Sequence, residues 1–280
     1  MRVLVTGYKG QLGYDVIKHL QARGIECQGV DIDDFDLTDR EAVASYITVY
    51  NPDTVVHCAA YTAVDKAEDN RDACYAVNVT GTENIVSACQ SVDSAMVYIS
   101  TDYVFPGTGE DPYETTSAKA PTGYYGLTKS QGEDAVLAGI DKHFIIRTAW
   151  VFGINGHNFV KTMLKLGRER DELRVVADQF GSPTYTDDLA KLICDMIVTD
   201  KYGVYHGTNE GFCSWFDFTS EIMKQAGLNT KVTPVASEEY PTRAIRPKNS
   251  RLSKSSLDQA GFNRLPAWQD ALKRFLGEVN

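Results

Sequence analysis

The sequence lacks three features that would place the protein in a membrane or on nucleic acid. No run of apolar residues approaches the roughly 20 that a membrane-spanning helix needs. The opening residues, MRVLVTGYKG, read as a strand followed by a glycine turn, so we expect no signal peptide. Positive charge is not in excess, because 38 acidic against 28 basic residues give a net charge of −10. That balance argues against a nucleic-acid partner.

Cysteine is scarce and shows no pairing pattern. The six cysteines form no C-x-x-C pair, and most of them lie within apolar stretches. Reduced thiols in the core of a cytoplasmic protein explain this pattern better than disulfides or metal ligands do. At 280 residues the chain is long enough for one large domain or two small ones.

The first half alternates short apolar runs with helix-period segments. Strands are expected at 3–6, 27–30, 54–57, 95–100 and 144–148, and helices at 10–23, 39–50, 72–90 and 124–138. The apolar runs are rich in β-branched residues and lack a clean alternation, as is typical of a parallel sheet buried on both faces. Right-handed crossovers then make the fold α/β and doubly wound, of the Rossmann type.

After residue 150 this rhythm loosens. Helical patterns at 158–170, 186–199, 214–226 and 266–276 alternate with short strands and connections that contain Pro or Gly. We expect residues 1–150 to form the nucleotide-binding Rossmann domain and 151–280 a smaller α/β substrate domain. Segments of the two are allowed to interleave.

A glycine turn joins the first strand to the first helix. Gly7, Gly10 and Gly13 permit a tight turn, close approach of the backbone to a pyrophosphate, and close packing of helix and strand. The helix N-terminus then offers free N–H groups and a positive dipole end to that pyrophosphate. A strand before the turn and a helix after it provide the context that a dinucleotide site requires. NADPH or NADH is therefore the expected cofactor.

The end of the second strand bears on which of the two nucleotides binds. Asp31 stands near the spacing at which a carboxylate accepts hydrogen bonds from the adenosine ribose, which favours NAD. Lys9, in the glycine turn, has the charge to hold a 2′-phosphate, so use of both cofactors stays open. Asp36 and Leu37 are placed to reach the adenine. The small Ala60 would let the cofactor pass close to the chain.

The chemistry is predicted at a tyrosine and a lysine four residues apart. Tyr125 and Lys129 project from one face of a helix, and an ammonium beside a phenol is expected to lower the phenol's pKa. Tyr125 can then exchange a proton with a substrate oxygen while a hydride moves. Lys129 can also hold the nicotinamide ribose. The hydroxyl of Thr101, or that of Ser100, lies at the end of a strand and can bind the same substrate oxygen.

Together these motifs resemble the dTDP-4-dehydrorhamnose reductase family of the extended short-chain dehydrogenases/reductases. The resemblance covers nearly the whole chain, through TGYKGQLG, AAYTAVDKAE, STDYVFPGTG, YYGLTKSQGE, RTAWVFG, NFVKTML, DQFGSPT and RPKNSRL. It implies that NAD(P)H delivers a hydride to the C4 ketone of dTDP-4-dehydro-β-L-rhamnose. It also implies that Tyr125 is the proton donor, Lys129 its tuning partner and Thr101 the second hydroxyl.

The resemblance implies further contacts with the cofactor and the substrate. Cofactor contacts are expected from Gly10, Gln11, Leu12, Asp31, Asp36, Leu37, Ala60, Tyr61 and Thr62. Sugar contacts are expected from Thr101, Asp102 and Trp150, and contacts with the nucleotide diphosphate from Lys161, Arg246 and Arg251.

Other members of the superfamily provide rival interpretations. A 4,6-dehydratase needs a glutamate after Asp102, where this chain has Tyr103, and the epimerase-reductases that make GDP-fucose use a cysteine that this loop lacks. A 4-epimerase on tightly held NAD stays open. So does a non-enzymatic subunit similar to the regulatory β subunit of methionine adenosyltransferase.

Metal and subunit state are less constrained by the sequence. Some relatives bind Mg²⁺ between acidic residues of two subunits, and Asp15, Asp187 and Asp188 lie in suitable regions. The chain ends soon after its last helix, which leaves few residues for such an interface. We therefore predict no required metal, and a monomer or homodimer.

Overall fold

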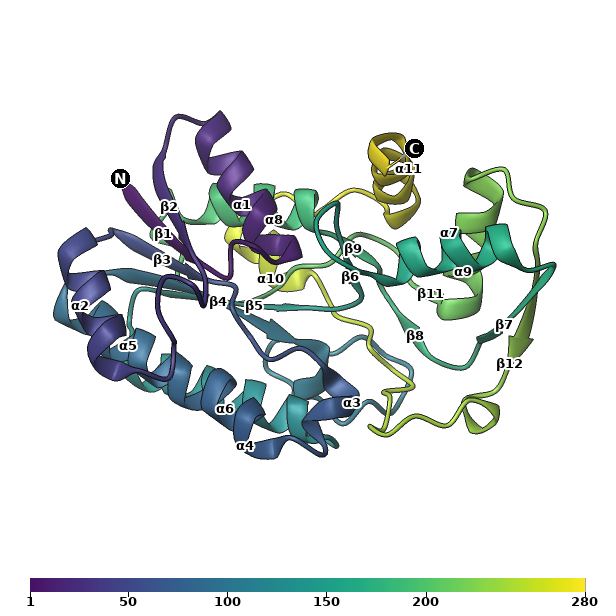
Figure 1. The fold of residues 1–280 in the computed structure, drawn as a ribbon, viewed down its shortest axis with the longest axis horizontal. Coiled ribbons are helices and arrows are strands. Elements are labelled where there is room, and N and C mark those ends of the chain that lie inside the picture. Colours follow the sequence, from purple (N-terminus) through teal and green to yellow (C-terminus); the bar gives the residue numbers. More distant parts are fainter. Residues whose placement is uncertain (280) are drawn as a thin grey trace.

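A six-stranded parallel sheet forms the centre of the protein, of which the computed structural model describes residues 1–279 (Figure 1). Its strands are β1 (Arg2–Thr6), β2 (Glu26–Val30), β3 (Thr54–His57), β4 (Ala95–Thr101), β5 (His143–Thr148) and β10 (Gly203–His206). They lie in the order β10-β5-β4-β3-β1-β2, and every neighbouring pair is parallel. The α/β doubly wound fold expected from the sequence is confirmed.

Helices cover both faces of this sheet (Figure 1). One face packs on α1 (Gln11–Ala22), α8 (Thr186–Met196) and α10 (Ser255–Ala260), and the other on α2 (Arg40–Tyr50), α5 (Gly81–Ser91) and α6 (Tyr124–Gly139). Val3 and Val5 of β1 contribute to the first core, and Leu4 between them to the second. Burial on both faces explains why the strand sequences are continuously apolar.

The helix expected at 72–90 is interrupted. It consists of α4 (Arg71–Tyr75), a π-helical turn η1 (Ala76–Thr80) and α5. Within the turn, the side chain of Asn78 accepts a hydrogen bond from Tyr61 N at 2.8 Å and donates to Thr128 Oγ1 at 3.0 Å. The wider turn therefore brings a polar side chain between the loop after β3 and helix α6, as π-turns near functional sites often do.

The second half forms a smaller lobe beside the sheet (Figure 1). Its core gathers the aromatic side chains of Phe152, Phe218, Trp268 and Phe275. The further elements of the second half are β6 (Val151–Phe152), α7 (Phe159–Glu169), β7 (Glu172–Val176), β8 (Phe180–Gly181), β9 (Thr184–Tyr185), β11 (Cys213–Ser214), α9 (Trp215–Gln225), β12 (Lys231–Val235), η3 (Ser237–Glu239) and α11 (Trp268–Val279). The first half also contains the short helices α3 (Val64–Ala67) and η2 (Asp102–Val104). Strand β10 and helix α8 return to the first layer, so the two halves interleave.

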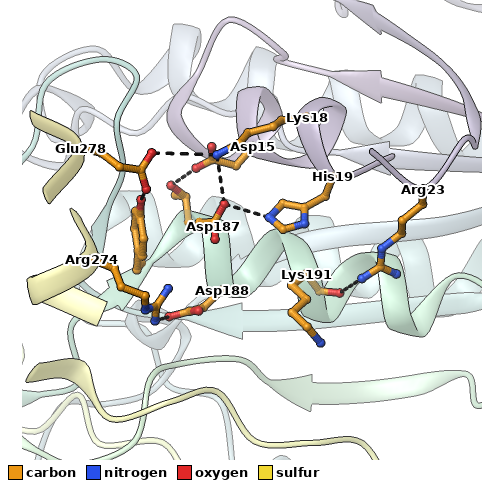
Figure 2. Close-up of polar contacts among 11 residues, drawn as sticks. Asp15, Lys18, His19, Arg23, Asp187, Asp188, Lys191, Arg274 and Glu278 are labelled. Atoms are coloured by element: carbon orange, nitrogen blue, oxygen red, sulfur yellow. Dashed lines mark hydrogen bonds and ion pairs between the residues drawn. The ribbon is translucent and has the colours of Figure 1, made fainter. Parts of the chain in front are cut away.

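Charged side chains join α1 to α8 (Figure 2). Asp187 of α8 accepts hydrogen bonds from His19 Nε2 at 2.9 Å and Lys18 Nζ at 3.4 Å. The buried carboxylate of Asp15 accepts from the hydroxyl of Thr186. These contacts seat the helix that follows the glycine turn on a helix from the second half.

Two of the same acidic residues bear on the Mg²⁺ site that some relatives have. Asp15 accepts a hydrogen bond from a hydroxyl of this chain, and Asp187 accepts hydrogen bonds from an imidazole and an ammonium. Asp188 accepts a hydrogen bond from Arg274 at 2.7 Å (Figure 2). Within residues 1–279, no three His, Cys, Asp or Glu side chains are grouped to hold a metal ion. The carboxylates therefore do not form a ready ligand set within one chain. No helix in the same range is long and apolar enough to cross a membrane.

Candidate active site

A cavity of about 930 Å³ opens at the carboxyl ends of the parallel strands. This is the edge at which open α/β sheets bind their ligands. Most of the residues predicted for the site line this one cavity: Gly7, Gly10, Gln11, Leu12, Gly13, Asp31, Asp36, Leu37, Ala60, Thr62, Thr101, Asp102, Tyr125, Lys129 and Trp150. Tyr61, Lys161, Arg246 and Arg251 do not line it.

The glycine turn has the shape that a pyrophosphate needs. Gly7 adopts a φ of +69°, and a Cβ there would lie 2.7 Å from Ala59 N. Gly10 N donates to Gly7 O at 3.0 Å and closes the turn. Among the described residues, no side chain caps the N-terminus of α1. The first N–H groups of this helix have no partner within the helix, so they are available to a ligand in the cavity. These features fit a dinucleotide phosphate.

The two groups expected to distinguish NAD from NADP lie near each other, Lys9 in the glycine turn after β1 and Asp31 directly after β2. The carboxylate of Asp31 lines the cavity and accepts a hydrogen bond from Lys9 N at 3.2 Å. The ammonium of Lys9 forms an ion pair with Asp33. A carboxylate of the kind that binds a ribose hydroxyl and a cation of the sign that a 2′-phosphate needs are therefore both present beside the turn.

Tyr61 supports the cavity wall without lining it. Its backbone N–H and C=O are both bound by the side chain of Asn78, at 2.8 and 3.2 Å, which fixes the segment that carries Ala60 and Thr62. The phenol of Tyr61 accepts from Asn70 at 3.4 Å. A direct contact with the cofactor remains a prediction for this residue.

Lys129 lies almost wholly inside the protein, with 2% of its surface exposed. Its ammonium sits 3.9 Å above the ring of Tyr98, a cation–π contact. Burial lowers the pKa of Lys129 to about 7, against the opposing charge of Glu133. The side chain is therefore poised between its two protonation states near neutral pH.

The pKa of Tyr125 does not follow the expectation. The spacing predicts that Lys129 lowers this pKa, but burial, followed by the carboxylate of Asp102, raises the pKa of Tyr125. Desolvation disfavours the phenolate more than neighbouring groups stabilise it. Tyr125 thus holds its proton at neutral pH, as a proton donor must.

Two strand-end hydroxyls were candidates for the second substrate contact, and they are engaged differently. Ser100 Oγ donates to Glu133 Oε1 at 2.5 Å. The hydroxyl of Thr101 donates to Asp102 Oδ1 at 3.0 Å and acts to lower the pKa of Tyr125. Of the two hydroxyls, that of Thr101 is therefore the one that affects the pKa of the Tyr125 phenol.

Asp102 is a buried carboxyl beside these groups. It accepts hydrogen bonds from Thr101 and from the hydroxyl of Ser250. Burial raises the pKa of Asp102 to about 6, although both hydrogen bonds oppose the shift. Ser250 belongs to the RPKNSRL stretch, so this stretch reaches the buried carboxyl of the candidate site.

Trp150 lines the cavity where β5 enters the second half. Its φ of +49° is unusual for a bulky residue. A Cβ on Gly181 would lie 2.8 Å from this indole, so the glycine of DQFGSPT makes room for it. The ring also stacks on Trp215, which the sequence argument missed.

The three cations expected to bind a diphosphate are held by groups of this chain. Arg246 pairs with Asp65 and donates to Tyr103 Oη at 3.0 Å. Lys161 donates to backbone carbonyls, one of them Gly156 O at 2.9 Å. The guanidinium of Arg251 lies over the ring of Phe180. Diphosphate binding by these residues remains a prediction.

A loop from the second half reaches over the glycine turn, which sequence reasoning missed. Asn155 Nδ2 donates to Lys9 O at 2.6 Å, and Asn158 Nδ2 to Gln11 Oε1 at 3.1 Å. Asn158 also caps α7 through Lys161 N. An asparagine before an amphipathic helix is a recognisable cap signal, but its second contact is not visible in the sequence.

A glycine turn at the first βα junction, a strand-end Thr101 and a Tyr125/Lys129 pair meeting in one cavity define an NAD(P)-dependent oxidoreductase of the short-chain dehydrogenase/reductase class. Comparison with known proteins narrows this class. Residues 1–280 match the family model of the RmlD substrate binding domain. The chain is 40% identical over 277 residues to the spore coat polysaccharide biosynthesis protein SpsK of Bacillus subtilis, covering 99% of this chain and 97% of that protein.

Two solved structures are similar over nearly their whole length. A dTDP-4-dehydrorhamnose reductase of Clostridium acetobutylicum is 42% identical with a TM-score of 0.98, covering 100% of this chain and 99% of that one. The dTDP-4-dehydrorhamnose reductase of Bacillus anthracis, solved in complex with NADP, is 42% identical with a TM-score of 0.97 and covers 99% of each chain. The chain belongs to the dTDP-4-dehydrorhamnose reductase family.

Proposed function

We propose that the protein reduces the C4 ketone of dTDP-4-dehydro-β-L-rhamnose to dTDP-β-L-rhamnose with NADPH or NADH. The observation that carries this proposal is the meeting of Thr101, Tyr125 and Lys129 with the glycine turn in one cavity. The full-length similarity to dTDP-4-dehydrorhamnose reductases supports the identity of the substrate. The Bacillus anthracis relative, solved with NADP, supports NADPH as one cofactor.

The residues of the cavity divide the proton chemistry between them. A bound reduced nicotinamide supplies the hydride for C4. Tyr125 donates its phenolic proton to the carbonyl oxygen, which becomes the C4 hydroxyl. The hydroxyl of Thr101 stabilises the phenolate that remains, in keeping with its lowering effect on that pKa. Lys129, as the ammonium, offers donors to the nicotinamide ribose and favours the same phenolate.

We also propose that the protein acts in the cytoplasm as a monomer or homodimer, with no nucleic acid or membrane as partner. All six cysteines are free thiols, four of them buried, which supports a reducing compartment. The net charge of −10 supports the absence of a nucleic-acid partner.

The test is to mix the protein with NADPH or NADH and dTDP-4-dehydrorhamnose and follow absorbance at the nicotinamide band. We expect stoichiometric oxidation and a product that co-elutes with dTDP-rhamnose. A 4-epimerase would turn over with no net oxidation, and a regulatory subunit would bind cofactor without turnover. Either result would overturn the proposal.

A further inference from the structure

Glu133 is a buried carboxylate that the proposed chemistry does not use. It lies on α6 one turn after Lys129 and two turns after Tyr125, and none of its surface is exposed. A carboxylate at such a site costs stability unless it is fully paired.

The pairing is complete and specific. Arg147 donates to both oxygens of Glu133, Nε to Oε1 and Nη2 to Oε2, each at 2.8 Å. Ser100 Oγ donates to Oε1 at 2.5 Å, and Lys119 Nζ lies 3.4 Å from Oε2. Arg147 is itself buried, and its third nitrogen donates to Thr115 O at 2.9 Å. Such a network, with all its members satisfied, is rigid.

The network joins the three elements that carry the predicted catalytic and sugar-binding residues. Ser100 immediately precedes Thr101 on β4, and Arg147 lies three residues before Trp150 at the end of β5. Ser100 and Arg147 are also paired across the β4–β5 ladder. One carboxylate on α6 therefore fixes the relative positions of β4, β5 and the helix that bears the tyrosine and lysine.

Stability alone does not account for this arrangement. An apolar set of the same volume would stabilise a core as well as or better than a buried ion pair does. What the charged network supplies is a single allowed arrangement of three elements. The charge of Glu133 also raises the pKa of Lys129 against the effect of burial, so Glu133 favours the ammonium form of Lys129.

We propose that Glu133 is a positioning residue for the reduction, which acts through Ser100 and Arg147 to hold Thr101 and Trp150 in register with Tyr125. This inference rests on the proposed function. It assigns no contact between Glu133 and substrate or cofactor.

The test compares Ser100→Ala, Glu133→Gln and the double variant with the wild-type chain. We expect kcat to fall about 100-fold in Glu133→Gln, since small displacements of reacting groups have effects of that size. In Ser100→Ala, which leaves the Glu133–Arg147 pair intact, we expect a fall of about tenfold, as for one hydrogen bond. The dissociation constant for NADPH should stay within about twofold in Ser100→Ala, which leaves the charge of Glu133 near Lys129 in place.

The double variant separates positioning from direct contact. If Ser100 acts only through Glu133, adding Ser100→Ala to Glu133→Gln costs nothing further in kcat. If the double variant instead shows the product of the two single losses in kcat, Ser100 contacts the substrate itself. That result would overturn the proposal. If Glu133→Gln does not fold, Arg147→Lys, which removes the paired hydrogen bonds to the same carboxylate, takes its place in the cycle with Ser100→Ala.

Val136→Ala is the matched control, because Val136 is fully buried on the same helix but packs in the apolar core. It should lower Tm while kcat stays near the wild-type value. Equal loss of kcat in Val136→Ala and Ser100→Ala at equal Tm would overturn the proposal. Absence of turnover by the wild-type chain overturns the proposed function itself. If the wild-type chain turns over and the variants have the same kcat, this inference alone is overturned.

Discussion

The indole of Trp150 lies face to face with that of Trp215, with ring centroids 3.6 Å apart and planes 13° from parallel. Trp215 begins α9 in the second half, and Trp150 lies two residues after the end of β5, so the stack joins the two halves beside the cavity. One face of Trp150 is thereby covered, and the ring lines the cavity in a fixed orientation.

Trp150→Ala should raise KM for the sugar nucleotide about tenfold, because an aromatic face for the sugar is lost. Cofactor affinity should change little. Trp215→Phe retains a ring behind Trp150 and should keep KM within about twofold of the wild-type value. Steady-state kinetics at saturating NADPH measure this. An unchanged KM in Trp150→Ala would remove the residue from the sugar site.

Tyr125→Phe should lower kcat by about 1,000-fold, the size of effect that loss of a general acid produces. The ring remains, so the dissociation constant for NADPH should stay within about threefold. Tyr124→Phe, on the same helix, is the control and should keep its turnover. If Tyr125→Phe loses turnover and cofactor binding equally, its role as proton donor is wrong.

Asp31→Asn should weaken NADH binding more than NADPH binding. The carboxylate is an acceptor for the ribose hydroxyl and repels a 2′-phosphate. The ratio of the two dissociation constants, NADH over NADPH, should rise about tenfold, as for a hydrogen bond to a charged group. Asp33→Asn, which removes a carboxylate outside the cavity lining, should leave NADH affinity unchanged. Fluorescence titration of each nucleotide checks this, and an unchanged ratio would contradict it.

Acid should destabilise the protein through two buried histidines. Burial lowers the pKa of His57 and of His206 to about 3, so below pH 6.5 the unfolded chain takes up protons that the native chain does not. Each therefore contributes stability that is present above pH 6.5 and is lost as pH falls, on the order of 1.4 kcal/mol per pH unit.

Urea unfolding at pH 7 and pH 5 measures this loss. His206→Gln should lose less stability between these pH values than the wild-type chain, because one of the two protonation sites is gone. Asp102 acts in the opposite sense below its pKa of about 6, and comparing variant with wild type cancels that contribution. Equal losses in the two proteins would contradict a neutral, buried His206.

Features that depend on short sequence spacing could be predicted. The glycine turn, the strand ends and the pair Tyr125/Lys129 follow from local periodicity, and the carboxyl ends of parallel strands meet at one edge. Most of the predicted residues therefore line one cavity, although no distant contact was used to predict them.

Features that depend on distant contacts could not be predicted. The pairing of Arg246 with Asp65 joins residues 181 positions apart, and Glu133 meets Ser100 only because α6 packs on β4. The π-helical turn exists where Asn78 binds the backbone of Tyr61, which no helical periodicity reveals. The raised pKa of Tyr125 has the same origin, since its burial outweighs a neighbouring charge that the spacing does reveal.

The central claim is hydride transfer from the reduced nicotinamide to C4 of the sugar. It is tested most directly by a single turnover with NADPH that carries deuterium at the transferable nicotinamide position, followed by NMR of the product sugar. The account predicts one deuterium at C4 of dTDP-rhamnose and none at the neighbouring carbons. A product without deuterium, or with deuterium at any other carbon, would contradict it.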